Sequence, residues 1–394
     1  MPRPAQERKD KKAPMPLSVL QVATSFPSWG GTELHILNLS EQLRLRGHDV
    51  TVACRPGKWV EARAQAMGLP TVPMTVRRQG DWRDFGKLRR FFRERPTDVV
   101  HVHWSLDMVV PVTAARLEGV PVRVLSRHMP YPFKTRAGTL LYSRLLFTRM
   151  VTVSDSVRRT LLRCGVPDAQ VEVIHHGTDV EAFARTTAPR RAVRADLGIP
   201  EDSVAVGIIG RIAPEKGHAV LLDALARLGD RYPLRLVVVG NGPDEARLRE
   251  IVTNLGVADR VLFAGFRDDV GNVISALDVV AVPSTWQEPC SAVVQQGMAL
   301  SKPVIGTLVG GTPEMVLDDE TGFLVPPSDA GALADAMARL AGDAFLRRRL
   351  GAAGRERVER YFSLRVMTDK VEALYHREYE SARGAAGLPK AAVS

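Results

Sequence analysis

Cysteine is scarce in this sequence, which has three in 394 residues: Cys54, Cys164 and Cys290. Their spacing matches neither a zinc-ligand pattern nor a disulfide framework, which disfavours metal-stapled and disulfide-rich secreted folds. Long hydrophobic runs are also missing, since no apolar stretch approaches the roughly 18–20 residues that a membrane-spanning helix needs. Residues 1–16 are polar, basic and Pro-rich, without the apolar core of a secretory signal, and predict a disordered tail. We therefore expect a cytoplasmic protein.

Several catalytic signatures are absent as well. The sequence has no G-x-S-x-G nucleophile elbow, no thiolate dyad and no G-x-x-x-x-G-K-[ST] phosphate loop, which disfavours hydrolases and nucleoside triphosphatases. The segment GNGPDE at 240–245 resembles the start of a dinucleotide fingerprint but lacks the third glycine, so no dinucleotide site is expected. No nucleic-acid-binding module is recognisable, and few aromatic residues alternate with basic ones, so nucleic acid is not an expected partner.

Positive charge is concentrated in the first half of the chain. Residues 1–190 carry 30 Lys and Arg against 17 Asp and Glu, a balance of +13, whereas the remainder has a balance of −3. By charge alone, this asymmetry indicates an anionic partner for the first half: nucleic acid, a membrane surface or an anionic substrate. The alternative is an Arg-rich composition that places charge on every solvated face.

Short β-branched runs alternate with amphipathic helical segments, which predicts parallel sheets covered by helices on both faces. In the first half the expected strands are 18–24, 49–54, 98–104, 121–126 and 150–154. After a polar stretch the pattern restarts, with expected strands at 204–210, 234–240, 260–265, 278–284, 302–307 and 321–326. Two such doubly wound domains normally hold a ligand between them, at the carboxyl ends of the strands.

Residues with suitable chemistry follow several of these strands. Arg211 and Lys216 flank a turn into a helix, where free N–H groups also favour an anion, so the pair would suit a diphosphate. A solvated basic turn is the alternative. Gly30 and Gly31 follow the first strand and would let backbone approach a ligand, although such pairs also occur in ordinary turns. His128 follows another strand and so falls at the expected cleft.

The remaining histidines at strand ends favour structural roles. His101 and His103 alternate on one strand and share one face, which would suit a metal ion, but no third ligand stands nearby and the strand is buried. His175 and His176 end the strand-like segment VEVI, and the glycine that follows them is typical of a turn.

Residues 284–300, STWQEPCSAVVQQGMAL, place a carboxylate before an apolar helix and two amides within it. Pro289 predicts the first helical position, where a missing N–H is not needed. Gln296 would then lie nearly two turns later on the same face as Glu288, separated by about 10 Å of helix rise. This spacing would suit a ligand that lies along the helix.

Taken in order, these segments resemble the family-4 retaining glycosyltransferases, which have the GT-B fold. The resemblance covers residues 17 to about 380 and rests on GGTE, GRIAPEKG, AVPSTWQEPCSAVVQQGMALSKPVIGT, GGTPEMV and TGFLVPPSD, each after its expected strand. It implies an α/β architecture of two doubly wound, Rossmann-like domains that face each other across a cleft. It also implies transfer of a sugar from a nucleotide-sugar donor to an acceptor hydroxyl, with retention at the anomeric carbon and without a cofactor or metal.

The resemblance also divides the chain. We expect an acceptor-binding domain at 17–185, a nucleotide-sugar-binding domain at 186–365, a helix that returns to the first domain at 366–382, and a flexible tail at 383–394.

Individual residues take roles from the family motifs. Arg211 and Lys216 correspond to the diphosphate-binding pair, whose cations would stabilise the charge of the departing nucleoside diphosphate. Glu288 matches the carboxylate that contacts the donor sugar, but the second, ribose-binding carboxylate is Gln296 here. An amide still accepts a ribose hydroxyl but without charge assistance, so we expect weaker nucleotide binding rather than inactivity. Alternatively, Gln296 faces the core and Gln295 binds the nucleotide.

The first domain contributes two further family positions. His128 corresponds to the histidine beside the donor sugar, and Gly31 to the glycine-rich loop over the reacting centre. The rest of the expected donor-binding set is Gly30, Gly210, Ser291 and Ala292. Front-face attack, in which the leaving phosphate takes the acceptor proton, would need no enzymic base.

The acceptor is expected to be a glycan or a lipid-linked or phosphorylated molecule, used in synthesis of cell-envelope polysaccharide, lipopolysaccharide or glycolipid at the cytoplasmic face of a membrane. Residues 83–95, RDFGKLRRFFRER, could form an interfacial helix for anionic lipid, although a sheet-covering helix is the favoured interpretation. The rival functions are another GT-B enzyme, such as a phosphorylase or an epimerase, and a non-catalytic sugar or nucleotide binder.

Overall fold

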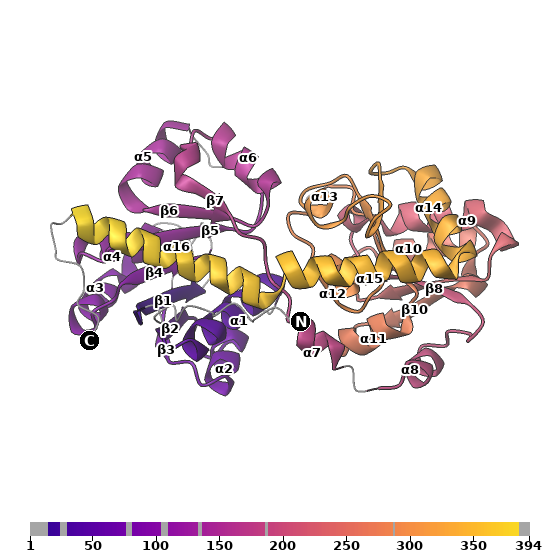
Figure 1. Ribbon diagram of the computed structural model, residues 1–394, viewed down its shortest axis with the longest axis horizontal. Helices are drawn as coiled ribbons and strands as arrows, with labels where there is room; N and C mark the ends of the chain where they lie inside the picture. The colour runs from indigo at the N-terminus through magenta and orange to yellow at the C-terminus, as the bar shows by residue number, and fades with distance from the viewer. Residues whose placement is uncertain are drawn as a thin grey trace, which may run out of the picture.

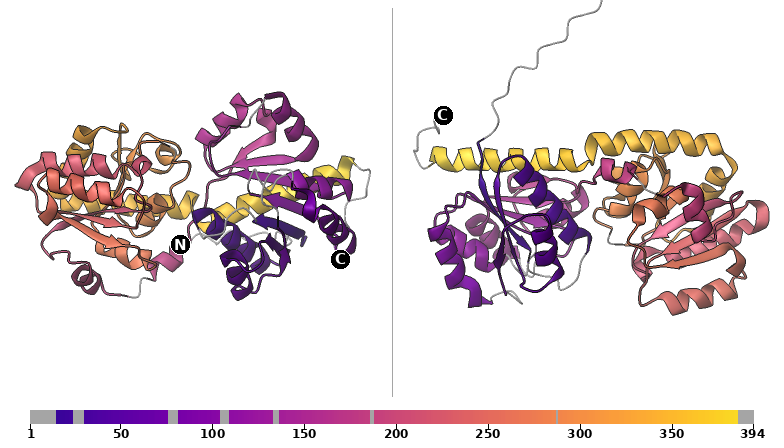
Figure 2. Two further views of the ribbon diagram at one scale, coloured as in Figure 1. Left: turned by 180° about the vertical axis from the view of Figure 1, so that it is seen from behind. Right: turned by 90° about the horizontal axis from the view of Figure 1, so that it is seen from below.

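The computed structural model describes residues 15–23, 30–75, 81–103, 109–132, 136–185, 188–286 and 288–385. It contains two α/β domains, each with one parallel sheet, that lie side by side (Figure 1). The two C-terminal helices run along one side of both domains (Figure 2). The predicted fold of two doubly wound domains is therefore confirmed. Among these residues, no helix is both long and apolar enough to cross a membrane.

The sheet of the first domain has the strand order β3-β2-β1-β4-β5-β6-β7. Its strands are β1 Ser18–Ala23, β2 Asp49–Cys54, β3 Thr71–Pro73, β4 Val99–Val102, β5 Val122–Arg127, β6 Arg149–Thr152 and β7 Val171–Val173. Its helices are α1 Gly31–Leu45, α2 Trp59–Ala66, α3 Phe85–Glu94, α4 Val109–Leu117, α5 Arg136–Leu146 and α6 Asp155–Arg163. The strand that the sequence did not predict, β3, has three residues at the sheet edge and ends in a proline, so it lacks a buried β-branched run.

The sheet of the second domain has the order β10-β9-β8-β11-β12-β13. Its strands are β8 Val204–Ile209, β9 Leu234–Val239, β10 Val261–Gly265, β11 Val279–Val282, β12 Val304–Thr307 and β13 Gly322–Val325. The helices of this half are α7 Val180–Ala184, α8 Arg190–Asp196, α9 His218–Leu228, α10 Glu245–Asn254, α11 Val270–Ala276, α12 Ala292–Ala299, α13 Thr312–Met315 and α14 Ala330–Gly342.

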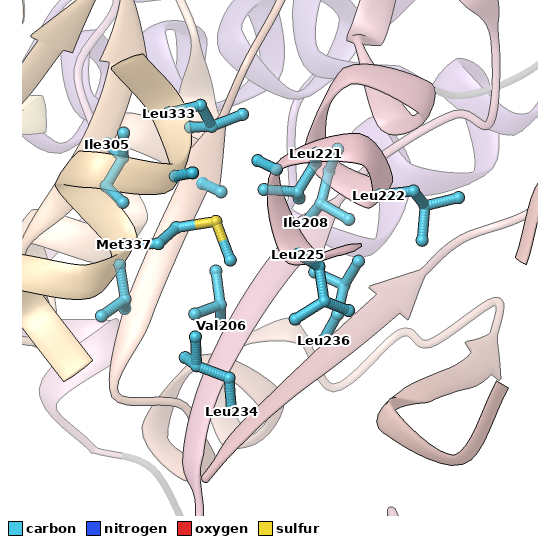
Figure 3. Close-up of a cluster of buried hydrophobic side chains, with 14 of the residues drawn as sticks. Val206, Ile208, Leu221, Leu222, Leu225, Leu234, Leu236, Ile305, Leu333 and Met337 are labelled. Atoms are coloured by element: carbon cyan, nitrogen blue, oxygen red, sulfur yellow. The ribbon is translucent and has the colours of Figure 1, made fainter. Parts of the chain in front are cut away.

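The core of the second domain forms where apolar helix faces meet the sheet. Figure 3 shows Leu221, Leu222 and Leu225 of α9 facing the side chains of β8 and β9. Met337 of α14 packs into the same cluster. The leucines at 221, 222 and 225 recur at helical spacing, so α9 buries one continuous face.

The C-terminal helices connect the domains. Helix α15, Ala344–Tyr361, packs on α12 of the second domain, and α16, Leu364–Ala385, crosses to the first (Figure 1). Side chains of α16 are buried in the first domain's core: Leu364, Met367, Val371, Leu374 and Tyr375. Of the two C-terminal helices, α16 thus packs on the first domain and α15 on the second.

Strand order fixes where a ligand can bind. In the first sheet β1 lies between β2 and β4, and in the second β8 lies between β9 and β11, so each sheet reverses its winding direction beside these strands. In folds of this kind, ligands bind at the carboxyl ends of the strands beside such a reversal. Gly30, the N-cap of α1, comes after β1 in the chain, and Gly210 directly follows β8.

Candidate functional site

A cavity of about 940 Å³ lies between the two domains, at the start of α1 and at the residues that follow β8. The first domain lines it with Gly30, Gly31, Leu34, His35, Asn38 and His176. The second domain lines it with Gly210, Arg211, Gly240, Asn241, Phe266, Arg267, Ala292, Val293, Gln295 and Gln296, among others. Its size suits a ligand as large as a nucleotide bearing a sugar.

Backbone rather than side chain forms the wall near β8. Gly210 has φ +140° and Gly240 has φ +128°, values that L side chains rarely adopt. A Cβ at Gly240 would lie 2.0 Å from the carbonyl oxygen of Gly210. Only glycine allows these two strand ends to touch, which keeps their peptide groups at the cavity.

The two expected cations are each paired with a carboxylate. Arg211 lines the cavity and forms an ion pair with Glu215, but its side chain is 64% exposed, so this pair contributes little. Lys216 Nζ donates to Glu288 Oε2 at 2.8 Å, and Ser284 Oγ donates to the same oxygen at 2.7 Å. The Glu288 carboxylate is therefore held in place beside Lys216.

The predicted helix start at Pro289 is wrong. Helix α12 begins at Ala292, with Ser291 as its N-cap, and Glu288 lies in the turn before it. The reason is that the carbonyl oxygen of Glu288 accepts the N–H of Gly311 at 2.9 Å, which takes this backbone out of a helical pattern. The expectation that Glu288 and Gln296 share one helix face is therefore also wrong.

The two glutamines of α12 have different environments. Gln295 is buried, and its Nε2 donates to the carbonyl oxygen of His176 at 2.8 Å. Gln296 is only partly buried and lines the cavity. Both side chains line the cavity, but Gln295 also anchors the segment after β7 through its amide nitrogen.

The neighbouring Cys290 is half-buried, and desolvation raises the pKa of its thiol to about 12, so it is no thiolate nucleophile at neutral pH.

The structure thus gathers part of the expected set at the cavity, namely Gly30, Gly31, Gly210, Arg211, Ala292 and Gln296. The others are not among its lining residues: Lys216, Glu288, Ser291 and His128.

A group of histidines forms the first-domain wall. His128 Nδ1 and His176 Nε2 lie 2.8 Å apart, and the ring of His35 stacks on that of His176 with 4.1 Å between centroids. His176 and His35 line the cavity, whereas His128 lies behind His176 and is buried. Sequence reasoning missed His35, although it lies one helical turn after Gly31, and it assigned His176 to a turn.

These imidazoles are neutral near neutral pH. Burial lowers the pKa of His176 to about 4 and that of His101 to about 3. Burial, and then the neighbouring imidazoles, lower the pKa values of His35, His103 and His128 well below the usual range. Each ring therefore has one donor and one acceptor nitrogen.

Two groups among the described residues have the spacing to hold a metal ion: His35 with His128 and His176, and His48 with Glu372 and His376. In the first group His128 and His176 already share a hydrogen bond, and the rings of His35 and His176 are inclined by 26°, so they do not converge on one point. The pair His101 and His103 does not ligate together either, because both nitrogens of His101 lie near Tyr375 Oη and Ser126 Oγ.

A carboxylate that the sequence did not single out joins the domains. Glu314 of α13 accepts the N–H of Asp155 at 2.9 Å, at the N-terminus of α6, and contacts His175 Nε2 at 2.8 Å. A helix N-terminus favours such a negative charge.

Comparison with known proteins identifies the family. The model described as "Glycosyltransferase Family 4" matches residues 29–182, and "Glycosyl transferases group 1" matches residues 189–357. A phosphatidyl-myo-inositol mannosyltransferase of Mycobacterium leprae is 30% identical over 350 residues, which is 86% of this chain and 90% of that protein. The chain belongs to the family-4 glycosyltransferases.

Another relative and several solved structures are consistent with this family. The lipopolysaccharide core biosynthesis glycosyltransferase LpsD of Rhizobium meliloti is 29% identical, over 89% of this chain and 96% of that protein. Among solved structures, a glycosyltransferase of Rickettsia africae superposes with a TM-score of 0.86 at 21% identity, over 92% of this chain and 98% of that one. HepE of Anabaena, solved with UDP, has a TM-score of 0.80 at 22% identity, over 91% and 99%. These similarities confirm the GT-B fold.

The buried histidines predict a loss of stability in mild acid. Below about pH 6.5 the unfolded chain binds protons at these histidines but the native glycosyltransferase does not. The free energy of unfolding therefore keeps its neutral-pH value above about pH 6.5 and decreases as the pH falls toward 4. Replacing His176 by Gln should make this fall smaller, as measured by the urea midpoint at about pH 7.5 and about pH 5. The exposed Lys370→Gln is the control; equal pH dependence in both variants would contradict the account.

Proposed function

We propose that this glycosyltransferase moves a sugar from a nucleoside-diphospho-sugar, bound in the cavity between the domains, to an acceptor hydroxyl. The observation that carries the proposal is the cavity itself, which combines Arg211 and glycine backbone from the second domain with neutral histidines from the first. HepE, which has a similar fold, was solved with UDP and with UDP-glucose. In this chain, the nucleotide would lie against β8, β9 and α12, and the sugar would face His176.

The diphosphate would lie beside Arg211, with Lys216 close along the chain. Negative charge accumulates on the departing diphosphate, and fixed cations stabilise the transition state more than the bound donor. Glu288 holds Lys216 by a 2.8 Å ion pair, and its carboxylate retains acceptor capacity for sugar hydroxyls. These two cations would supply the charge that a divalent metal provides in other transferases.

Retention at the anomeric carbon is proposed from the family motifs. In front-face attack the leaving phosphate takes the acceptor proton, so the enzyme needs no basic side chain. The anomeric configuration of the product, read from its proton coupling in NMR, would be inverted if this were wrong.

The acceptor is proposed to be a glycolipid or lipopolysaccharide precursor at an anionic membrane surface. Relatives named for phosphatidyl-myo-inositol and lipopolysaccharide core substrates support this class. The segment 83–95 does not provide the surface, because Leu88 and Phe92 of α3 are buried in the first domain's core. Helix α5 instead exposes Leu141, Tyr142 and Leu145.

The exposed side chains of α5 suit a membrane. Leu141 and Leu145 are one helical turn apart, Tyr142 lies beside them, and the exposed Arg144 adds a positive charge. Apolar side chains flanked by Arg bind anionic lipid interfaces.

Nucleotide titration tests the donor site. We expect calorimetry in EDTA with UDP, GDP, ADP and CDP to show binding of one nucleotide, and Arg211→Ala to weaken it by about tenfold or more, as expected for loss of a charged hydrogen bond. Arg227→Ala is a matched control, because Arg227 also forms an exposed ion pair with an acid four residues away, Asp223. Equal binding by both variants would contradict the assigned diphosphate site.

The same titration tests the unusual amide. Gln296→Glu restores the family's carboxylate and should tighten nucleotide binding about fivefold through a charge-assisted hydrogen bond to ribose. Gln295→Glu should give no such gain, since Gln295 is bonded to the backbone of His176. Tighter binding by the Gln295 variant alone would reverse the two roles.

Vesicle sedimentation tests the membrane surface. Wild-type protein should sediment with phosphatidylglycerol vesicles at low salt, and the triple change L141S/Y142S/L145S should leave almost none bound, since about 1.5–3 kcal/mol per apolar side chain is lost. The control changes Leu255 and Phe345, exposed apolar residues of the second domain, to Ser. A wild-type protein that stays in the supernatant would remove the membrane from the proposal.

A further inference from the structure

An unbroken series of polar contacts runs from the C-terminal helix to the cavity. Tyr375 of α16 lies over the first sheet, where Figure 1 shows α16 crossing the strands. Gln21 Nε2 donates to Tyr375 Oη at 3.1 Å, and Gln21 Oε1 lies 2.8 Å from His103 Nε2. His103 Nδ1 lies 3.2 Å from His128 Nε2. His128 Nδ1 lies 2.8 Å from His176 Nε2, and His176 lines the cavity.

Strand register explains why these residues meet. Gln21 of β1 is paired with His101 of β4, and His103 follows two residues later on the same face. His128 comes directly after β5, the next strand in the sheet. The polar side chains therefore form a row across adjacent strands, beneath α16.

Gln21 determines the direction of every hydrogen bond in the row. Its amide nitrogen is used toward Tyr375, so its oxygen faces His103 and requires a proton on His103 Nε2. A neutral imidazole protonated on Nε2 accepts at Nδ1, so His103 Nδ1 accepts from His128 Nε2–H. By the same rule His128 Nδ1 accepts from His176 Nε2–H.

Donors and acceptors can also be assigned consistently at the other end of the row. Tyr375 accepts from Gln21, so its hydroxyl proton is free to go to His101 Nδ1, 2.5 Å away. His101 then carries its proton on Nε2 and donates to Ser126 Oγ at 2.7 Å. One assignment satisfies all six contacts, with every imidazole neutral and protonated on Nε2.

Because these side chains are buried, the direction of each hydrogen bond in the row matters for stability. Gln21 and Tyr375 are fully buried, and His101, His103 and His128 are at most 4% exposed. An unsatisfied donor or acceptor at any of these positions would cost the full desolvation of that group. Burial also lowers the pKa values of the imidazoles, so the row does not take up protons near neutral pH.

We propose that Gln21 and Tyr375 are positioning residues that hold His128 and His176 in the Nε2–H tautomer. His176 then presents an unprotonated Nδ1 as the acceptor for a hydroxyl of the donor sugar in the cavity. The part that concerns the sugar rests on the proposed function, whereas the tautomers are a property of the free protein. His176, which sequence reasoning assigned to a turn, thereby becomes the cavity-facing member of the row.

NMR of protein labelled with ¹⁵N-histidine tests the tautomers directly. Long-range ¹H–¹⁵N correlations distinguish Nε2–H from Nδ1–H rings, and assignment uses single His→Gln variants. We expect Nε2–H signals for His101, His103, His128 and His176 in the wild-type protein. A proton on Nδ1 of His128 or His176 would overturn the proposal without any variant.

Two variants test the role of the row. Gln21→Leu removes the oxygen that orients His103, and Tyr375→Phe keeps the aromatic ring but removes the acceptor of the Gln21 amide. Both should shift His128 and His176 toward mixed tautomers. Thr368→Val is the control, because Thr368 is equally buried on α16 but its hydroxyl donates within the helix, to the carbonyl oxygen of Leu364.

Binding separates this proposal from the proposed function. UDP and UDP-glucose, and GDP and GDP-mannose, are titrated into wild type and variants. Gln21→Leu and Tyr375→Phe should weaken the nucleotide-sugar about fivefold, as expected for one lost hydrogen bond, and leave the nucleoside diphosphate unchanged. Equal affinities in variants and wild type would refute the positioning role. Failure of every nucleotide to bind the wild type would refute the proposed function and the sugar contact. The tautomer assignment would not be affected, because NMR of the free protein tests it.

Discussion

The packing of α16 against the first domain is the constraint on which the rest of this structure depends. The helix begins beside the second domain and buries Leu364, Met367, Val371 and Leu374 in the first domain's core. An apolar face of this length fixes the position of the helix, and through it the spacing of the two sheets. The cavity lies where the start of α1 in the first domain faces the residues after β8 in the second.

Polar contacts also hold the two domains together. Glu314 of the second domain binds the N-terminus of α6, and Gln295 binds the backbone of His176. Tyr375 of α16 accepts a hydrogen bond from Gln21, so the same helix is part of the hydrogen-bonded row that ends at the cavity. The element that holds the domains together thus also supports the side chains that face the ligand.

Local sequence pattern was sufficient for most of the fold. Continuous Val and Ile runs gave strands such as β8 and β9 within one residue of their observed ends, because a buried parallel strand needs apolar side chains on both faces. The start of α12 was predicted wrongly from Pro289, because a hydrogen bond between Glu288 and Gly311, 23 positions apart, decides the local backbone. Segment 83–95 has a strongly basic composition, but burial against the sheet decides the role of its aromatic residues.

Part of the site was predictable because some of its residues directly follow strands that the local pattern predicts. Arg211 and Gly30 directly follow strands, so their place at the cavity follows from sheet topology alone. His176 and Gln21 could not be found this way, because their roles depend on register across strands and on a helix 354 positions from Gln21. Whether Gln296 binds ribose depends on side-chain environment, which local pattern does not specify.

The central claim is that one donor molecule contacts both domains. Hydrogen–deuterium exchange with UDP-glucose or GDP-mannose tests it most directly, because exchange is read peptide by peptide. The account predicts that the donor that binds slows exchange at the start of α1, at the loop after β8 and at the start of α12 together. Protection confined to the second domain, or absent with both donors, would contradict a donor site built from the two domains.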